Sequence, residues 1–366
     1  MAFLPVKEGG LGFQSAAARC EAAFLASWEA TSPALQAELE LYTSFALRAA
    51  VPAMDTQVGH AFRFLAAQGA PVSARRPAGQ QRGRQKQLTT ALVRSAQRSL
   101  RNSLADIPTA ILLSGGGQGK AALMIPRCQA HEVSDDEFAV FLRRRLLYPD
   151  PSGRAILPCG HASVGPRRTV CQHQAAQPDW GVHPLSCNVG PGWDRRHADI
   201  RDTWLEWLKE RFGVDRVLRE HVIHQWNRTK SDGEVERAVL DVVVTVPGHG
   251  LFALDISVTD AAAESYRRPA ARARPGTAAK TREGEKHRRY PTRADTPILV
   301  PIIYEAGGRA GGEAETWLRG IVSDVDSDEQ ADAIRDIRQR TAAALVRGNA
   351  GLLTSAGPPA QGWPWR

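Results

Sequence analysis

The sequence predicts an α+β fold: a helical N-terminal region, a short segment rich in cysteine and histidine, and a mixed four-stranded sheet flanked by helices. Apolar residues recur at spacings of three and four over residues 14–70, which is typical of amphipathic helices. Three of the five cysteines fall within residues 159–187, together with three histidines. From residue 199 onward, short runs rich in Val, Ile and Leu alternate with helical patterns, as expected for a sheet covered by helices.

Length, charge and hydropathy limit the class of protein. The 366 residues are enough for two or three domains, and the formal net charge of +8 favours a polyanionic partner, nucleic acid first. No apolar run is long enough to cross a bilayer, and the N-terminus lacks the pattern of a secretory signal. The odd number of cysteines argues against a disulfide framework.

Residues 1–150 are expected to form the helical region. Residues 71–87 are rich in Pro, Gly, Gln and Arg, which is typical of a flexible basic linker. The next helix, residues 88–104, carries three arginines on one side, which form either a solvated face or a surface that follows a phosphate backbone. These are Arg94, Arg98 and Arg101.

The run SGGGQGKA at residues 114–121 resembles a phosphate-binding loop only in part. A P-loop has Gly where Ser114 stands, and Ser or Thr where Ala121 stands. The hydroxyl group that would hold magnesium is therefore missing, and we expect no nucleotide site there.

Residues 151–198 form the segment with clustered metal ligands. Two close pairs of soft or borderline ligands, nine residues apart, are how a loop-rich stretch can enclose a tetrahedral zinc ion and be ordered by it. The four residues are Cys171, His173, His183 and Cys187. Cys159 and His161 are alternative ligands, either of which can replace His173. The competing interpretation is a loop whose free Cys and His residues bind nothing.

Residues 199–347 are expected to form the second globular part, and residues 348–366 a flexible tail. The predicted order of elements is helix 199–212, strands 216–225, 237–246 and 250–258, a basic region 266–293, strand 297–304, and helices 312–323 and 327–347.

The stretch LDVVVTVPGHGLFALDISV, residues 240–258, predicts a hairpin with an acid near each end, Asp241 and Asp255. Acids inside Val- and Leu-rich strands are costly unless they are paired or bind a cation. Because the hairpin brings its two ends together, both carboxylates can bind one hard cation such as Mg²⁺. Such a cation activates water and stabilises charge on an attacked phosphate. The alternative is a pair of water-exposed aspartates on edge strands.

Neighbouring segments supply further groups for such a site. Glu220, on the preceding strand, is a third candidate acid. Lys286 and Tyr290 lie on a predicted helical turn with three residues between them, and supply a basic and a phenolic group.

Two groups of basic residues are candidates for contacts with a nucleic-acid backbone. Ten Lys or Arg residues lie between Arg267 and Arg293, both included, and the candidates among them are Arg282, Arg288 and Arg289. The second group precedes the helix at 199–212, where it either grips a phosphate or caps the helix, and consists of Arg195, Arg196 and His197.

Seven motifs in this order resemble the C-terminal region of site-specific non-LTR retrotransposon proteins, which carry a reverse transcriptase, a Cys/His knuckle, an Arg-His motif and a restriction-like endonuclease of the PD-(D/E)xK class. The motifs are LPVKEGGLGFQSAA, DEFAVFLRRRLLYP, HPLSC, RRHADIRD, LDVVV with LFALDISVT, EKHRRYP, and PILVPIIYEAGGRAGGEA. Two positions depart from the family pattern: Leu240 stands where Pro is usual, and His173 where Cys is more common.

The resemblance implies a restriction-endonuclease-like core for residues 199–347, with Asp241 and Asp255 as Mg²⁺ ligands, Lys286 as the displaced catalytic lysine, Tyr290 as its neighbour and Glu220 as a helper acid. It also implies structural Zn²⁺ in the knuckle. The expected activity is Mg²⁺-dependent nicking of double-stranded DNA at a target site by a nuclear protein. The element's RNA and a second copy of the chain are further candidate partners, and no membrane is expected.

The chain contains no polymerase core, because no Asp-Asp motif preceded by an aromatic and a small residue is found. Reverse transcription is therefore not expected from this chain alone, and residues 1–150 resemble only a remnant of the polymerase's C-terminal region. The alternative function is a non-catalytic nucleic-acid-binding remnant of such a protein.

Overall fold

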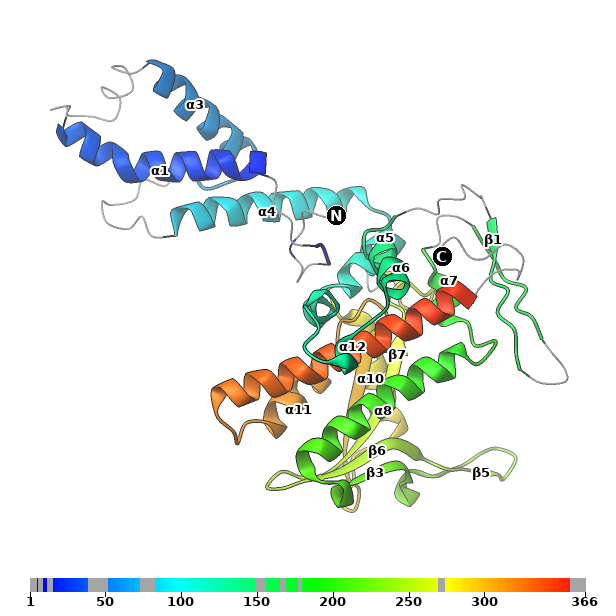
Figure 1. The fold of residues 1–366 in the computed structure, drawn as a ribbon. Coiled ribbons are helices and arrows are strands. Elements are labelled where there is room, and N and C mark those ends of the chain that lie inside the picture. Colours follow the sequence, from blue (N-terminus) through cyan, green and yellow to red (C-terminus); the bar gives the residue numbers. More distant parts are fainter. Residues whose placement is uncertain are drawn as a thin grey trace. The chain divides into compact units, whose positions relative to one another are not determined.

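The computed structural model describes residues 5, 9–11, 16–38, 52–72, 83–148, 156–164, 169–176, 180–268 and 274–355. The chain divides into two compact units, a smaller one that includes Leu11–Leu104 and a larger one that includes Ala105–Arg366. The structure confirms the α+β class (Figure 1). No described helix is long and apolar enough to cross a membrane.

The smaller unit contains three described helices, α1 (Ala16–Glu38), α3 (Pro52–Ala67) and α4 (Arg84–Ser103). Their buried side chains form one core that includes Leu25, Leu65 and Leu88. Arg84, almost fully buried, donates to Glu29 from Nε to Oε2 at 2.7 Å. The helices predicted from the 3.6-residue periodicity are thus confirmed, whereas most of the predicted linker lies outside the described residues. Arg94, Arg98 and Arg101 of α4 are exposed, as either interpretation of that face requires.

The larger unit begins with segments that the sequence analysis assigned to the helical N-terminal region. These are α5 (Asp106–Ser114), the 3₁₀ helices η2 (Gly117–Leu123) and η3 (Gln129–His131), and α6 (Asp135–Arg145). Ser134 caps α6 in a capping box with Glu137, because each side chain binds the other residue's backbone N–H. These elements pack with the larger unit.

The glycine-rich run at residues 114–121 is a packing device. A Cβ atom at Gly119 would lie 2.6 Å from the carbonyl oxygen of Gly307, and one at Gly307 would lie 2.4 Å from Ser114 Oγ. Only glycine allows two backbone segments to approach this closely. The structure therefore explains the glycines without a phosphate ligand.

The centre of the larger unit is a four-stranded sheet in the order β3-β6-β7-β8. Its strands are β3 (Val217–Val222), β6 (Val239–Val246), β7 (Gly250–Thr259) and β8 (Ile298–Glu305). The first three strands pair antiparallel, and β7 pairs parallel with β8. All four were predicted within a few residues, and the sheet is mixed as expected.

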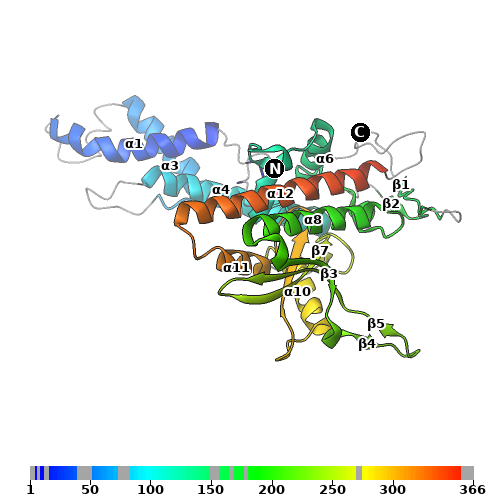
Figure 2. The same ribbon diagram turned by 60° about the horizontal axis from the view of Figure 1, so that its bottom comes forward.

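Helices cover both faces of this sheet (Figure 2). On one face lie α8 (Gly192–Phe212), α11 (Gly312–Ile321) and α12 (Ser327–Ser355), and on the other lies α10 (Thr277–Arg289). Ile200, Trp204 and Leu208 of α8 follow the helical period and are buried against alternate residues of the strands. Helices α8 and α12 lie side by side.

The remaining described elements are short. They are β1 (Ile156–Pro158), β2 (Gln174–Ala176), α7 (Val182–Ser186), η4 (Val214–Arg216), η5 (His224–Trp226), β4 (Arg228–Thr229) and β5 (Val235–Glu236). Strands β1 and β2 pair antiparallel, as do β4 and β5.

Two elements differ from the prediction. The structure contains α10 in what the sequence indicated as a basic region with only a helical turn, because Gly276 adopts φ +90° and begins a new helix after the Pro- and Arg-rich run. Helix α12 continues to Ser355, so the prediction of a flexible tail from residue 348 was wrong for residues 348–355. Leu352 and Leu353 are buried there against a cluster that includes Leu185.

Glu305 ties α10 to β8. Its Oε1 atom accepts the backbone N–H of Ala279 in the first turn of α10 at 3.3 Å. Burial raises the pKa of Glu305 to about 7, although this hydrogen bond and Arg309 favour the ionised form. The folded protein therefore binds this proton at pH values where the unfolded chain has lost it.

We expect the free energy of unfolding to fall as pH rises from about 4.5 to about 7, and Glu305→Gln to remove roughly 3 kcal/mol of that fall. Denaturant titrations at several pH values measure this. Glu264→Gln, an exposed acid, is the control. Parallel pH curves for Glu305→Gln and the unmodified protein would contradict the expectation.

Candidate functional sites

The two predicted aspartates meet where β6 and β7 separate. Regular pairing of these strands ends at the pair Val242 and Leu254. Asp241 and Asp255 are the residues just beyond that pair, one on each strand. Asp241 Oδ2 accepts the backbone N–H of Ile256 at 2.6 Å, so its side chain occupies the gap left by the missing backbone pairing. Both acids consequently lie at one point of the sheet.

Lys286 joins this pair from α10. Its Nζ atom donates to Asp255 Oδ1 at 2.7 Å, and both side chains are largely buried. Burial raises the pKa of Asp255 and the nearby charge of Asp241 adds to this, whereas Lys286 lowers it. The other oxygen, Asp255 Oδ2, is buried and has no hydrogen-bond partner within the described part of the chain.

The residues at this point fit a hard divalent cation. The donors are carboxylate oxygens, and a buried, unpartnered oxygen such as Asp255 Oδ2 is an acceptor that a cation would satisfy. We name Asp241, Asp255 and Lys286 the carboxylate centre.

His197 contacts the carboxylate centre from α8, which covers the face of the sheet opposite α10. Its Nε2 atom donates to the carbonyl oxygen of Ile256 at 3.1 Å and lies 3.3 Å from Asp241 Oδ1. The hydrogen bond to Asp241 raises the pKa of His197, against the effect of burial. His197 was predicted to contact DNA, and the structure gives it a place beside Asp241.

Glu220 lies on β3, opposite Asp241, but its carboxylate binds elsewhere. It is paired with Arg201, which also donates from Nε to Asp202 at 2.9 Å. Glu220 has φ +49° and is skipped in the β3–β6 register, where Arg219 and His221 are paired on either side. A non-glycine residue in this conformation is strained, and such strain is concentrated at functional sites.

Tyr290 closes the end of α10. Its ring packs on Trp226 with centroids 5.4 Å apart, in a cluster that includes Leu240 and Leu299. Burial and the charges of Asp255 and Asp241 raise its pKa. Tyr290 therefore fixes the helix that carries Lys286.

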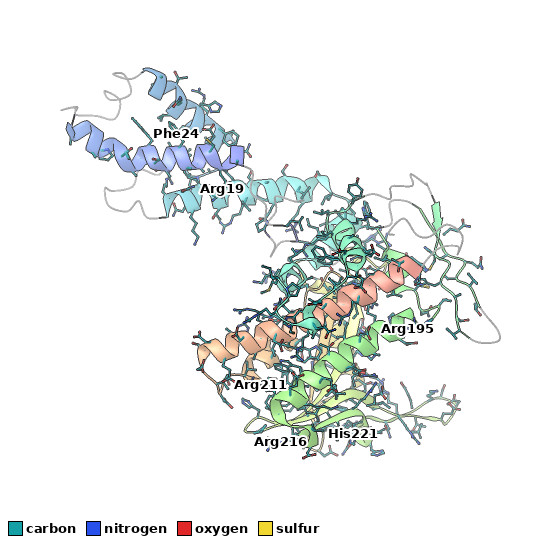
Figure 3. The ribbon with its side chains drawn as sticks, in the orientation of Figure 1. Arg19, Phe24, Arg195, Arg211, Arg216 and His221 are labelled. Carbon is teal, nitrogen blue, oxygen red and sulfur yellow. The ribbon has the colours of Figure 1, made fainter. Side chains whose placement is uncertain are left out.

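The predicted backbone-binding arginines fall into two groups. Arg195 and Arg288 are exposed, and Figure 3 shows Arg195 at the start of α8. Arg282 and Arg289 are engaged, because Arg282 donates to Glu285 at 2.6 Å and Arg289 donates to the carbonyl oxygen of Trp226 at 3.0 Å.

For Arg196 the structure replaces the predicted DNA contact with an internal role. Its side chain is 2% exposed and donates to the carbonyl oxygen of Leu185 at 3.1 Å and to Asn349 Oδ1 at 2.9 Å. One helical residue is rotated by about 100° from the next. Arg196 therefore points toward α12 while Arg195 remains in water.

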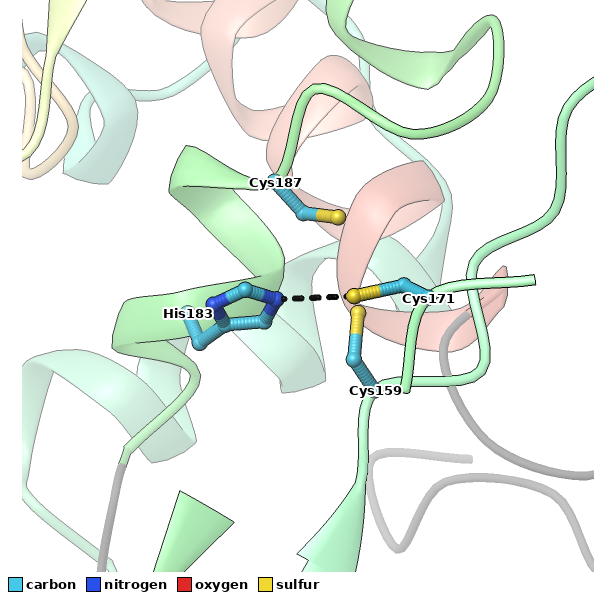
Figure 4. A group of neighbouring side chains, drawn as sticks. All are labelled: Cys159, Cys171, His183 and Cys187. Carbon is cyan, nitrogen blue, oxygen red and sulfur yellow. Dashed lines mark hydrogen bonds between the residues drawn. The ribbon is translucent and has the colours of Figure 1, made fainter. Parts of the chain in front are cut away.

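A second candidate centre consists of Cys159, Cys171, His183 and Cys187 (Figure 4), whose ligand atoms all lie within 4.8 Å of one another. The hairpin of β1 and β2 supplies the first two residues, and the short helix α7 supplies the others. Cys171 Sγ lies 3.3 Å from His183 Nε2. Three thiols and one imidazole in close approach are a ligand set for a tetrahedral metal, of which zinc is the usual one.

Cys159 takes the position for which the sequence analysis had preferred His173. The backbone N–H of Cys159 donates to the carbonyl oxygen of His173 at 2.8 Å, so the two residues are neighbours across the hairpin. The His173 ring instead stacks on His183, with centroids 3.7 Å apart. His161, the other alternative, donates from Nε2 to the carbonyl oxygen of Leu352 at 2.7 Å and so anchors the hairpin to α12.

The electrostatics of this cluster agree with a metal site. Burial lowers the pKa of His183 to about 4, and the neighbouring His173 adds to this, so the imidazole is neutral and can act as a ligand. Burial raises the pKa of Cys159 and of Cys187, so the thiols keep their protons unless a cation replaces them.

A third group of possible metal ligands consists of Cys128, His131 and Asp336, and hydrogen bonds rather than a metal account for their closeness. His131 Nε2 lies 2.8 Å from Asp336 Oδ1, and its Nδ1 atom accepts the backbone N–H of Arg127 at 3.3 Å. Both ring nitrogens are thus already hydrogen-bonded, and the group joins η3 to α12.

No protein-family model matches the chain, and no curated protein matches it at a significant level.

Proposed function

We propose that the larger unit is a divalent-metal-dependent DNA endonuclease with a restriction-like core, related to the endonuclease of non-LTR retrotransposon proteins. One observation carries the proposal: Asp241, Asp255 and Lys286 converge where β6 and β7 separate, with a buried acceptor oxygen left without a partner. The order of sequence motifs and the net charge of +8 support the choice of DNA.

Each residue of the carboxylate centre has a role in this proposal. Asp241 and Asp255 would hold Mg²⁺, which when bound supplies positive charge at the attacked phosphate. Lys286 would orient the attacking water through its ammonium group and lower the pKa of Asp255 by its charge. His197 would hold Asp241 in place, and the exposed Arg195 and Arg288 would contact the DNA backbone.

The Cys/His cluster would bind Zn²⁺ and stabilise the segment that precedes α8, which contains β1, β2 and α7. Its residues lie just before α8 in the chain, and Arg196 joins both segments to α12. In this proposal zinc has a structural role and takes no part in phosphate hydrolysis.

The test is nicking of supercoiled plasmid by the full chain, with and without Mg²⁺. We expect nicked circles only with Mg²⁺, and Asp241→Ala to lower the rate by about 100-fold or more. Asp215→Ala, which removes an exposed acid, is the matched control. Salt-sensitive DNA binding without nicking, unchanged in Asp241→Ala, would instead support a non-catalytic nucleic-acid-binding protein.

A further inference from the structure

Trp193 is an exposed indole at the start of α8. It is 40% exposed, whereas Trp204 and Trp207 of the same helix are 1% and 4% exposed. The indole plane is nearly parallel to the ring of His197, at 10°, with centroids 6.2 Å apart. One side of the indole therefore has an aromatic neighbour, and much of its remaining surface is in water.

This indole lies next to the carboxylate centre. His197, on which it stacks, is 3.3 Å from Asp241 through Nε2. The exposed Arg195 lies between these two residues in the sequence and supplies a positive charge on the same turn of the helix. An aromatic face and the carboxylate centre are thus linked through His197, and Arg195 adds a positive charge elsewhere on the same helical turn.

The backbone that carries Trp193 is held on both sides. A Cβ atom at Gly192 would lie 2.7 Å from Leu352 Cδ2, and one at Gly190 would lie 2.6 Å from the carbonyl oxygen of Ala162. Arg196 fixes the following turn through Leu185 and Asn349. A surface that is fixed before binding loses little conformational entropy when a ligand stacks on it.

We propose that Trp193 is a stacking platform for an unpaired base, and that the preferred substrate is DNA with unpaired nucleotides beside the scissile phosphate. In a fully paired duplex each base face is covered by its neighbours, so the indole has no base to stack on. An unpaired nucleotide exposes its face, and stacking on an aromatic side chain is tolerant of base identity. The inference rests on the proposed nuclease function, because a scissile phosphate exists only if the protein cuts DNA.

The test compares binding of two labelled DNAs by fluorescence anisotropy, with Ca²⁺ in place of Mg²⁺. One is a paired duplex and the other is the same duplex with a central unpaired bubble. We expect Trp193→Ala to weaken binding of the bubble about tenfold while the duplex changes less than about twofold. Trp193→Phe should retain most of the bubble affinity, and Ile125→Ala, which truncates a residue that is 87% exposed, should change neither.

Equal weakening of both DNAs by Trp193→Ala, or no weakening of either, would overturn the platform. Plasmid nicking in Mg²⁺ separates this result from a failure of the nuclease proposal. If Asp241-dependent nicking persists while Trp193→Ala binds both DNAs normally, only the platform fails. If the bubble preference depends on Trp193 and no DNA is cut, the platform stands and the nuclease fails.

Discussion

Lys286→Met is expected to lower Mg²⁺-dependent nicking by about 100- to 1000-fold, as for loss of a group that stabilises a developing charge. Lys286 Nζ lies 2.7 Å from Asp255 Oδ1, and its charge opposes the rise in the pKa of Asp255 that burial causes. In the proposed reaction its removal would take away both the group that orients the attacking water and the positive charge that lowers the pKa of Asp255. Initial rates on supercoiled plasmid measure the effect.

The matched control is Lys280→Met, which removes an exposed lysine from the same helix. It should leave the rate within about twofold, because surface substitutions of this kind change little. Removing one partner of a buried ion pair also destabilises a protein, by about 3–5 kcal/mol. Lys286→Arg therefore serves as a second variant that keeps the charge. A Lys286→Met protein that is folded, by thermal melting, and fully active would refute the assignment.

Cys159→Ser is expected to abolish tight binding of one metal ion, whereas His173→Ala should retain it. Cys159 Sγ belongs to the group of ligand atoms within 4.8 Å, and His173 lies outside it. Metal content after dialysis, and the thiolate-to-metal absorption of the Co²⁺-loaded protein, distinguish the two variants. Loss of metal from His173→Ala with retention in Cys159→Ser would show that the histidine is the ligand.

The same pair of variants tests the contribution of metal to folding. Structural zinc contributes on the order of 10 kcal/mol in isolated zinc-finger peptides. We therefore expect Cys159→Ser to melt well below the unmodified protein, and His173→Ala to melt close to it. Chelation of the metal should reproduce the lower melting temperature. A Cys20→Ser variant, which removes an exposed thiol outside the cluster, controls for cysteine chemistry in general.

Strand positions could be predicted from the sequence because β6 and β8 are dense runs of β-branched residues and β7 is a largely apolar run beside a turn signal. The hairpin of β6 and β7 shows this well, since PGHG can form only the turn between them. Helix α10 was less predictable, because proline, glycine and arginine precede it and its start depends on the single residue Gly276. The packing of α10 on β7 and β8 stabilises the helix, which its local sequence alone would not.

The carboxylate centre was predictable in composition but not in detail. Two acids in apolar strands indicated a shared site, but spacing alone could not show that Asp241 fills the gap beside Ile256 or that His197 reaches it from α8. The spacing of residues in the sequence also could not decide whether Cys159 or His173 is the fourth ligand. The two residues face each other across a hairpin, and only its register decides which side chain places a ligand atom in the cluster.

The last two turns of α12 contact both the metal-binding segment and the start of α8, so neither segment can be moved to another protein without them. Gly348 packs against Arg196, Asn349 accepts from it, and Leu352 contacts both His161 and Gly192. A fusion protein that transplanted residues 156–192 alone would leave behind the surface that seats them. Swapping this segment between proteins therefore requires exchanging the end of α12 as well, and deleting residues after 347 should compromise both centres together.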